Sequence, residues 1–173
     1  SIIDECWDAM EKFIGRVAET KYDQKANVNE NGNYQWADWL SYEPLESCSG
    51  RAFGNNGPLP ETIGYWNYLC ASYWAIDAGM MRDMAAATGR DAAKYAAMEA
   101  EAKDYIKAPF LTPEGKFRTA VLNTMQTPAL FALRNGIVEG KAKEDMIARL
   151  RENFAEHGNC LQTGFLGPSI LMK

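Results

Sequence analysis

The segment from Pro60 to Thr88 constrains the fold most, because it has helical spacing and is apolar on more than one side. Its main apolar stripe recurs at steps of three and four residues, and Tyr65, Tyr68 and Trp74 lie off that stripe. A helix at a protein surface buries one face, whereas a helix that is apolar around most of its circumference has neighbours on two sides. The segment is therefore predicted to be the inner helix of a double layer.

Four other segments have the apolar spacing of amphipathic helices. They cover residues 2–20, 92–107, 127–136 and 141–156. Only a short turn around Gly89 separates the inner helix from the segment that follows it, and such turns join helices into antiparallel hairpins. The predicted fold class is therefore all-α, built from antiparallel helical hairpins.

Several local features of these elements can be checked separately. Gly89 is expected to end its helix in the left-handed conformation, and Asp91 is expected to cap the next helix. A short strand is expected near residues 117–121. Cys6 and Cys70 fall on apolar faces and are expected in the core as small hydrophobic residues.

The composition narrows the classes of partner and cofactor. Hydrophobic residues make up 47% of the 173 residues and charged residues 24%, and no apolar run is long enough to suggest a membrane partner. The 18 basic and 23 acidic residues give a net charge of -5, which repels phosphate and disfavours nucleic acid as a partner. The cysteines are widely spaced and His157 is the single histidine, so no zinc site or other cofactor is expected.

The densest cluster of polar and aromatic residues lies at 34–43, inside a connection of residues 21–60 that is rich in Asn, Gly, Ser and Pro. Long connections in compact domains are usually functional. Aromatic rings such as Trp36 and Trp39 stack on the apolar faces of sugars, while a carboxylate such as Asp38 accepts hydrogen bonds from the hydroxyls. The cluster favours a carbohydrate site, and the alternative that the two tryptophans cover the core stays open.

The same connection supplies carboxylates for the acid and base pair that glycoside hydrolysis needs. The candidates are Asp38, Glu43, Glu46 and Glu61. Each of them also fits a surface or helix-capping role, Glu61 above all, because a helix start favours a negative charge.

Two turns that combine polar residues with helix starts, at 123–128 and 159–168, are further candidate binding segments. Exposed N–H groups at helix starts can bind ligand oxygens. The alternative is that Thr127 and Thr163 are ordinary helix caps.

Three motifs occur in the order found in a known family. They are Ala37-Asp38-Trp39-Leu40, Gln126-Thr127 before an apolar helix, and Leu161-Gln162-Thr163-Gly164-Phe165-Leu166-Gly167. With the Tyr- and Trp-rich helix between the first two, they resemble the catalytic domain of bacterial α-L-rhamnosidases, glycoside hydrolase family 78. The resemblance covers most of the chain and implies an (α/α)6 barrel, of which these residues form about half.

The resemblance implies a fragment of an inverting glycoside hydrolase that acts on terminal α-L-rhamnosides. Asp38 and Trp39 are expected at the sugar, and residues of the other two motifs are expected to shape the pocket. The full set of expected substrate-binding residues is Trp36, Asp38, Trp39, Gln126, Thr127, Thr163 and Phe165. Cys160 and Ala37 replace a histidine and a glycine of the family pattern, which changes the hydroxyl contacts the pocket can make.

The family's acid and base motifs match no residue of this chain, so no catalytic residue is assigned and the isolated fragment is expected to be inactive. Two alternatives stay open. One is another (α/α)6 carbohydrate enzyme, such as an unsaturated uronyl hydrolase, in which Asp38 itself is catalytic. The other is a helical carbohydrate-binding module that performs no chemistry.

Residues 1–173 are thus expected to be part of a barrel domain within a longer polypeptide, because the chain stops in the apolar stretch at 170–172. The expected partners are a carbohydrate substrate and the rest of the parent polypeptide. A homo-oligomer is left open, since a cut barrel exposes apolar surface. A periplasmic or extracellular location is favoured over a cytoplasmic one.

Overall fold

The computed structural model describes residues 1–20, 43, 53–54, 57–58 and 60–172. The helices are α1 (Ile2–Thr20), α3 (Pro60–Ala87), α4 (Ala93–Phe110), the 3-10 helix η1 (Ala120–Thr124), α5 (Gln126–Arg134), α6 (Gly140–Glu156) and α7 (Leu166–Leu171). Two strands of two residues each, β1 (Phe53–Gly54) and β2 (Gly57–Pro58), pair antiparallel. The predicted all-α class is confirmed. No helix among the described residues is long and apolar enough to cross a membrane.

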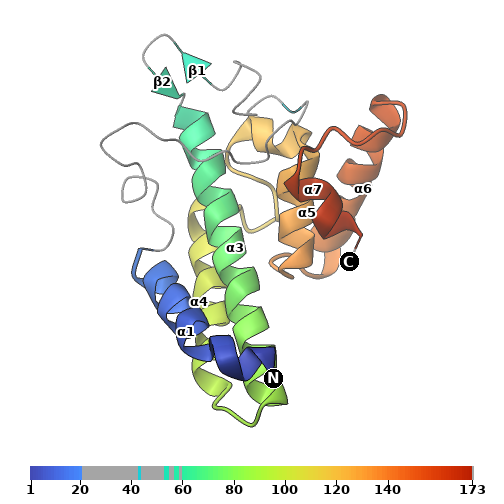
Figure 1. Cartoon of the computed structure of the whole chain (residues 1–173). Helices are drawn as coiled ribbons and strands as arrows, with labels where there is room; N and C mark the ends of the chain where they lie inside the picture. The colour runs from blue at the N-terminus through green and yellow to red at the C-terminus, as the bar shows by residue number, and fades with distance from the viewer. Residues whose placement is uncertain (21–42, 44–52, 55–56, 59, 173) are drawn as a thin grey trace.

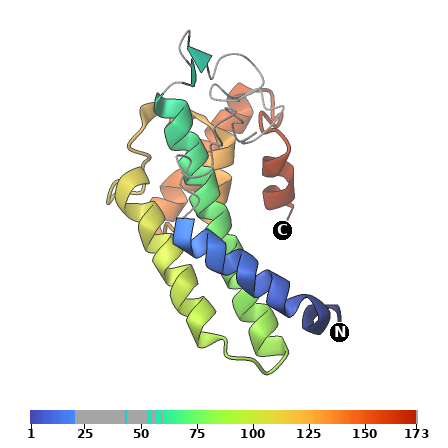
Figure 2. The same cartoon turned by 60° about the vertical axis from the view of Figure 1, so that its left-hand side comes forward.

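Helix α3 is the centre of the fold, with α1 and α4 on one side and the group of α5, α6 and α7 on the other (Figure 1). Figure 2 shows α1 crossing the α3–α4 hairpin obliquely. Tyr65, Tyr68 and Trp74, which lie off the main stripe, are all buried. Burial on both sides explains why this helix lacks a polar face, and the predicted inner helix is confirmed.

The turn between α3 and α4 follows the predicted chemistry. Gly89 has φ +70°, and the N–H of Arg90 donates to the carbonyl of Ala85 at 2.8 Å, which satisfies a carbonyl at the helix end. The Asp91 carboxylate accepts a hydrogen bond from the N–H of Ala93 at 2.9 Å. These contacts make α3 and α4 an antiparallel hairpin.

The strand expected at 117–121 is wrong. Phe117 forms only an isolated bridge with Leu111, and η1 follows. The reason is that the Asn123 side chain satisfies both backbone groups of Phe117, accepting from its N–H at 2.9 Å and donating to its carbonyl at 2.7 Å. With these groups satisfied locally, the segment needs no second strand.

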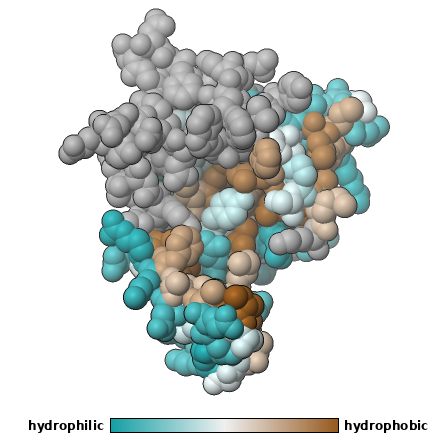
Figure 3. Space-filling view, in the orientation of Figure 1, coloured by the Kyte–Doolittle hydropathy of each residue, from teal (hydrophilic) through white to brown (hydrophobic). Residues whose placement is uncertain are grey.

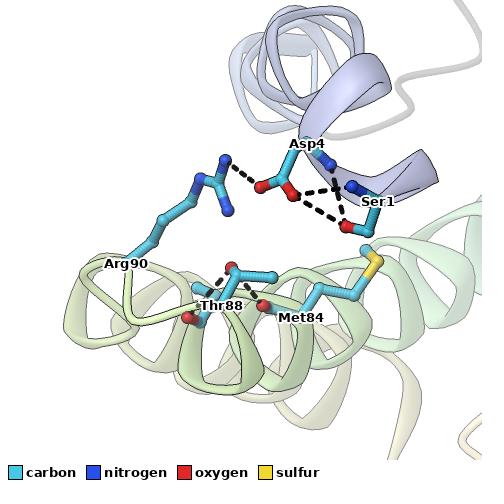
Figure 4. A network of polar contacts seen from close by, with 6 residues as sticks. Ser1, Asp4, Met84, Thr88 and Arg90 are labelled. Atoms are coloured by element: carbon cyan, nitrogen blue, oxygen red, sulfur yellow. Dashed lines mark hydrogen bonds and ion pairs between the residues drawn. The ribbon is translucent and has the colours of Figure 1, made fainter.

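Helix α1 contributes Trp7, Ile14 and Val17 to the buried core, and polar contacts around Trp7 join it further to the α3–α4 hairpin. The Arg90 guanidinium lies 4.5 Å from the centre of the Trp7 ring and donates to the Asp4 carboxylate at 2.7 Å, as Figure 4 shows. The Glu11 carboxylate accepts from the Tyr95 hydroxyl at 2.7 Å and pairs with Lys94. The hairpin residues in these contacts are Arg90, in the turn before α4, and Lys94 and Tyr95, in the first turn of α4.

The expectation for Cys6 is wrong, whereas Cys70 is buried as expected. The apolar stripe of α1 is wider than the face that α3 and α4 cover. Phe13, seven residues from Cys6, is on the uncovered flank and is also exposed, as is Ile2.

Figure 3 shows hydrophilic side chains over much of the lower part of the molecule, with hydrophobic ones between the two helix groups and toward α5 and α7.

The hydrogen bonds of Asp4 and Glu11 with the α3–α4 hairpin predict that the stability of the fold depends on pH. The hydrogen bond from Arg90 holds the pKa of Asp4 far below its ordinary value, and the bond from Lys94 lowers the pKa of Glu11. A carboxylate whose pKa is lowered by folding stabilises the fold fully above its unfolded pKa, and loses that effect as the pH falls through the folded pKa. The Tm is therefore expected to fall on acidification below about pH 4.5.

The test compares Tm against pH for the protein and for the double variant Asp4→Asn with Glu11→Gln. The variant should have a lower Tm at neutral pH and a shallower loss of Tm in acid. Glu5→Gln, which removes an exposed carboxylate of the same helix, is the control. An unchanged acid slope in the double variant would contradict the assignment.

Candidate functional site

The predicted motif at Gln126 and Thr127 forms the first turn of α5, and both side chains are fully buried. The buried carboxylate of Glu43 accepts hydrogen bonds from the N–H of Gln126 and, at 3.0 Å, from that of Thr127. Pro128 follows and has no N–H to satisfy. The first N–H groups of α5 therefore share one acceptor, Oε1 of a residue 83 positions before Gln126.

The other side of this turn is attached to α3. The hydroxyl of Tyr68 donates to the carbonyl of Pro128 at 2.7 Å, and burial raises the pKa of the Tyr68 phenol above its ordinary value. The hydroxyl therefore remains a donor throughout the physiological pH range.

The side chain of Gln126 makes three hydrogen bonds within the protein. Its Nε2 donates to Asn153 Oδ1 at 2.8 Å and to the carbonyl of Cys160 at 3.3 Å, and its Oε1 accepts from the N–H of Gln162 at 2.9 Å. Asn153, on α6, also donates to the carbonyl of Thr124 at 2.8 Å. One amide thus joins α5, α6 and the third motif.

After α6, the chain returns to the side chain of Gln126 through a turn with left-handed backbone conformation. Gly158 and Asn159 have φ of 64° and 60°, and the N–H of Asn159 donates to the carbonyl of Phe154 at 2.7 Å. Asparagine is among the few residues with a side chain that enter this region readily. The turn directs residues 160–162 back to α5.

Thr163 and Gly167 pack directly on each other at the start of α7. Thr163 is 9% exposed. A Cβ atom placed on Gly167 would lie 2.2 Å from the Thr163 Cβ, so only glycine fits there. Phe165, between them in the chain, is 69% exposed.

The structure therefore brings the Gln126-Thr127 motif together with Gln162 of the third motif, next to Thr163 in the chain. Phe165 is exposed beside them in the chain. Trp36, Asp38 and Trp39 lie outside the described residues. Their roles, like those of the other expected substrate-binding residues, stay predictions.

From the sequence, Glu43 is only one candidate carboxylate among four, and Asn153 is not predicted as a site residue. One signal in the sequence points to the need for an acceptor at the start of α5, and it does not identify Glu43 as that acceptor. The N-cap position of α5 is Met125, whose side chain cannot accept from the N–H groups of the first turn, so a buried helix start here needs an acceptor from elsewhere.

Other features of the described residues lie away from this junction. A cavity of about 520 Å³ separates the end of α4 from the start of α6, and its walls include Lys107, Arg118 and Val138 but none of the predicted site residues. Within the described ranges no group of three or more His, Cys, Asp or Glu side chains could hold a metal ion.

Comparison with known proteins identifies the family. A model of the bacterial alpha-L-rhamnosidase 6 hairpin glycosidase domain matches residues 1–173. The chain belongs to this family. An alpha-L-rhamnosidase of Formosa agariphila is 27% identical over 175 residues, which cover 99% of this chain and 17% of that protein. The chain thus spans less than a fifth of the length of that rhamnosidase.

A solved structure shows the same fold. The crystal structure of Streptomyces avermitilis alpha-L-rhamnosidase complexed with L-rhamnose matches with a TM-score of 0.60 at 16% sequence identity, over 93% of this chain and 14% of that one. The helical hairpins described above are thus part of a six-hairpin rhamnosidase domain. This agrees with the fold class predicted from the sequence.

The contact between Thr163 and Gly167 predicts the effect of a single methyl group. Gly167→Ala is expected to destabilise the protein by about 1–3 kcal/mol, because the added Cβ overlaps Thr163 and the segment must shift. The matched control is Gly15→Ala in α1, where nothing lies within 4 Å of the added atom and a gain of up to about 1 kcal/mol is expected. Urea unfolding measures both, and equal effects would contradict the packing.

Proposed function

We propose that residues 1–173 are part of the barrel domain of an inverting glycoside hydrolase that removes terminal α-L-rhamnose. The observation that carries the proposal is the family match across the whole chain. The geometry supports it, since the first turn of α5 gathers the Gln126-Thr127 motif and the residues that precede Thr163. The proposed partners are accordingly a carbohydrate substrate and the remainder of the parent polypeptide.

In this proposal the chain supplies substrate contacts and the shape of the pocket. Asp38 accepts hydrogen bonds from sugar hydroxyls, and Trp36 and Trp39 stack on the apolar faces of the ring. Gln126 contributes through the shape it imposes, because its amide is already bonded to Asn153, Cys160 and Gln162. Three further residues, Thr127, Thr163 and Phe165, border the same region.

The chemistry itself is assigned to groups elsewhere in the parent protein. An inverting hydrolase uses a carboxylic acid that protonates the leaving oxygen and a carboxylate that activates water, roughly 6.5–9.5 Å apart. Residues 1–173 alone are therefore proposed to be inactive, because binding groups without the acid and base cannot cleave the bond.

The first test is hydrolysis of 4-nitrophenyl α-L-rhamnoside by the full-length protein. We expect release of nitrophenol, with the β-anomer of L-rhamnose as the first product seen by NMR, because inversion exchanges the anomeric configuration. The 173-residue fragment should show no turnover. The 4-nitrophenyl α-L-fucoside is the control, and equal rates on the two glycosides would contradict the proposed substrate.

The second test is Asp38→Asn in the full-length protein. If Asp38 holds sugar hydroxyls, losing its charge should weaken binding of L-rhamnose about 10- to 100-fold, as expected for hydrogen bonds to a charged group. Calorimetry with L-rhamnose and steady-state kinetics separate binding from turnover. Loss of kcat with binding retained would instead assign Asp38 to the chemical step, as in the uronyl hydrolase alternative.

A further inference from the structure

We propose that Glu43 is a positioning residue, which acts by tying the segment that ends at Glu43 to the turn of α5 that also holds residues 160–162. The inference rests on the proposed function, because the segment before Glu43 carries the predicted sugar contacts Asp38 and Trp39. Glu43 itself touches no substrate in this proposal. Its role is to limit, through the few residues that connect them, how far Asp38 can lie from the first turn of α5.

The contacts of Glu43 are those of an anchor. Its side chain is only 2% exposed, and a buried carboxylate is costly unless hydrogen-bonded. Two N–H groups of α5 donate to it, and the positive end of the helix dipole favours its charge. Met125 supplies no side-chain cap. The N–H groups at the start of α5 therefore need the Glu43 carboxylate as acceptor, and the buried carboxylate needs these N–H groups as donors.

The same turn holds the third motif by different atoms. The backbone of Gln126 and Thr127 binds Glu43, while the side chain of Gln126 binds the backbone of Cys160 and Gln162. Segments far apart in the chain therefore meet within one turn of helix. Movement of either segment must strain or break contacts at this turn.

The distance along the chain makes the anchor effective. Asp38 is five residues before Glu43, and five residues of fully extended chain reach at most about 18 Å. A cap supplied locally at position 125 would stabilise α5 equally well but would place no other segment. The use of a distant carboxylate is what links the first motif to α5.

The test uses the full-length protein with three variants at Glu43. Glu43→Leu removes the carboxylate oxygen that accepts both hydrogen bonds, at similar volume, Glu43→Asp retracts the carboxylate by one methylene, and Glu43→Gln keeps an acceptor oxygen in place. The matched control is Asn135→Ala, which removes the hydrogen bond from Asn135 Nδ2 to the carbonyl of Ser72 (3.2 Å) at the other end of α5. Asn135 is buried and belongs to none of the three motifs.

The readouts are kcat, KM for 4-nitrophenyl α-L-rhamnoside, Tm, and hydrogen exchange of amides 126–127 and 160–165. Glu43→Leu should raise KM about tenfold or more, with faster exchange at both sets of amides. Glu43→Asp should raise KM less while keeping the Tm near that of the parent, and Glu43→Gln should recover most of the binding. Asn135→Ala should lower the Tm and leave KM unchanged.

If Glu43→Leu fails to fold, Glu43→Asp and Glu43→Gln decide the question. Unchanged KM and exchange in the Glu43 variants that fold would overturn the inference, as would a KM increase of equal size in Asn135→Ala. A parent protein that neither hydrolyses the rhamnoside nor binds L-rhamnose would instead refute the proposed function. In that case hydrogen exchange alone decides the inference about Glu43. Faster exchange of amides 160–165 in the Glu43 variants, but not in Asn135→Ala, would support it. The same exchange rates in the Glu43 variants and in Asn135→Ala would refute it.

Discussion

The N–H groups at the start of a buried helix need acceptors, and the rest of this structure depends on how α5 meets that requirement. Seven of the nine residues of α5 are buried, so water cannot serve. The acceptor is a carboxylate from a distant segment. The carbonyl of Pro128 in this turn accepts a hydrogen bond from Tyr68 of α3. The side-chain amide of Gln126 binds Asn153 of α6 and the carbonyl of Cys160, which follows α6. Four parts of the sequence therefore converge on three consecutive residues.

Helix α3 fixes α5 at both of its ends. Tyr68 donates to Pro128 at the start of α5, and Ser72, one turn further along α3, accepts from Asn135 at the end. The hydroxyl of Ser72 donates to the carbonyl of Tyr68 at 2.8 Å, so the polar groups of this buried surface are connected. A helix with apolar residues on two sides can hold α1 and α4 while keeping these few polar groups for α5.

Hydrophobic periodicity predicted α1, α3, α4, α5 and α6 in their order, because each of them is a local pattern that repeats over several turns, whereas the short η1 and α7 were not among the helices it predicted. The burial of Tyr65 and Tyr68 was predicted on a different ground, because apolar residues off the main stripe need neighbours on a second side of the helix. Periodicity was wrong where an isolated side chain decides the backbone, as Asn123 does at Phe117, and where a stripe is wider than its covered face, as at Cys6. The contact of Glu43 with α5 could not be predicted, because spacing in sequence carries no information on pairs that lie 83 residues apart.

The separation between Glu43 and Gln126 also has a consequence for the order of folding. The chain between them contains α3, α4 and η1, and a contact that closes so long a loop has a large entropic cost before it contributes any stability. The α3–α4 hairpin forms from neighbouring residues and has no such delay. The contact of Glu43 with α5 is therefore expected to form late, on helices that have already assembled.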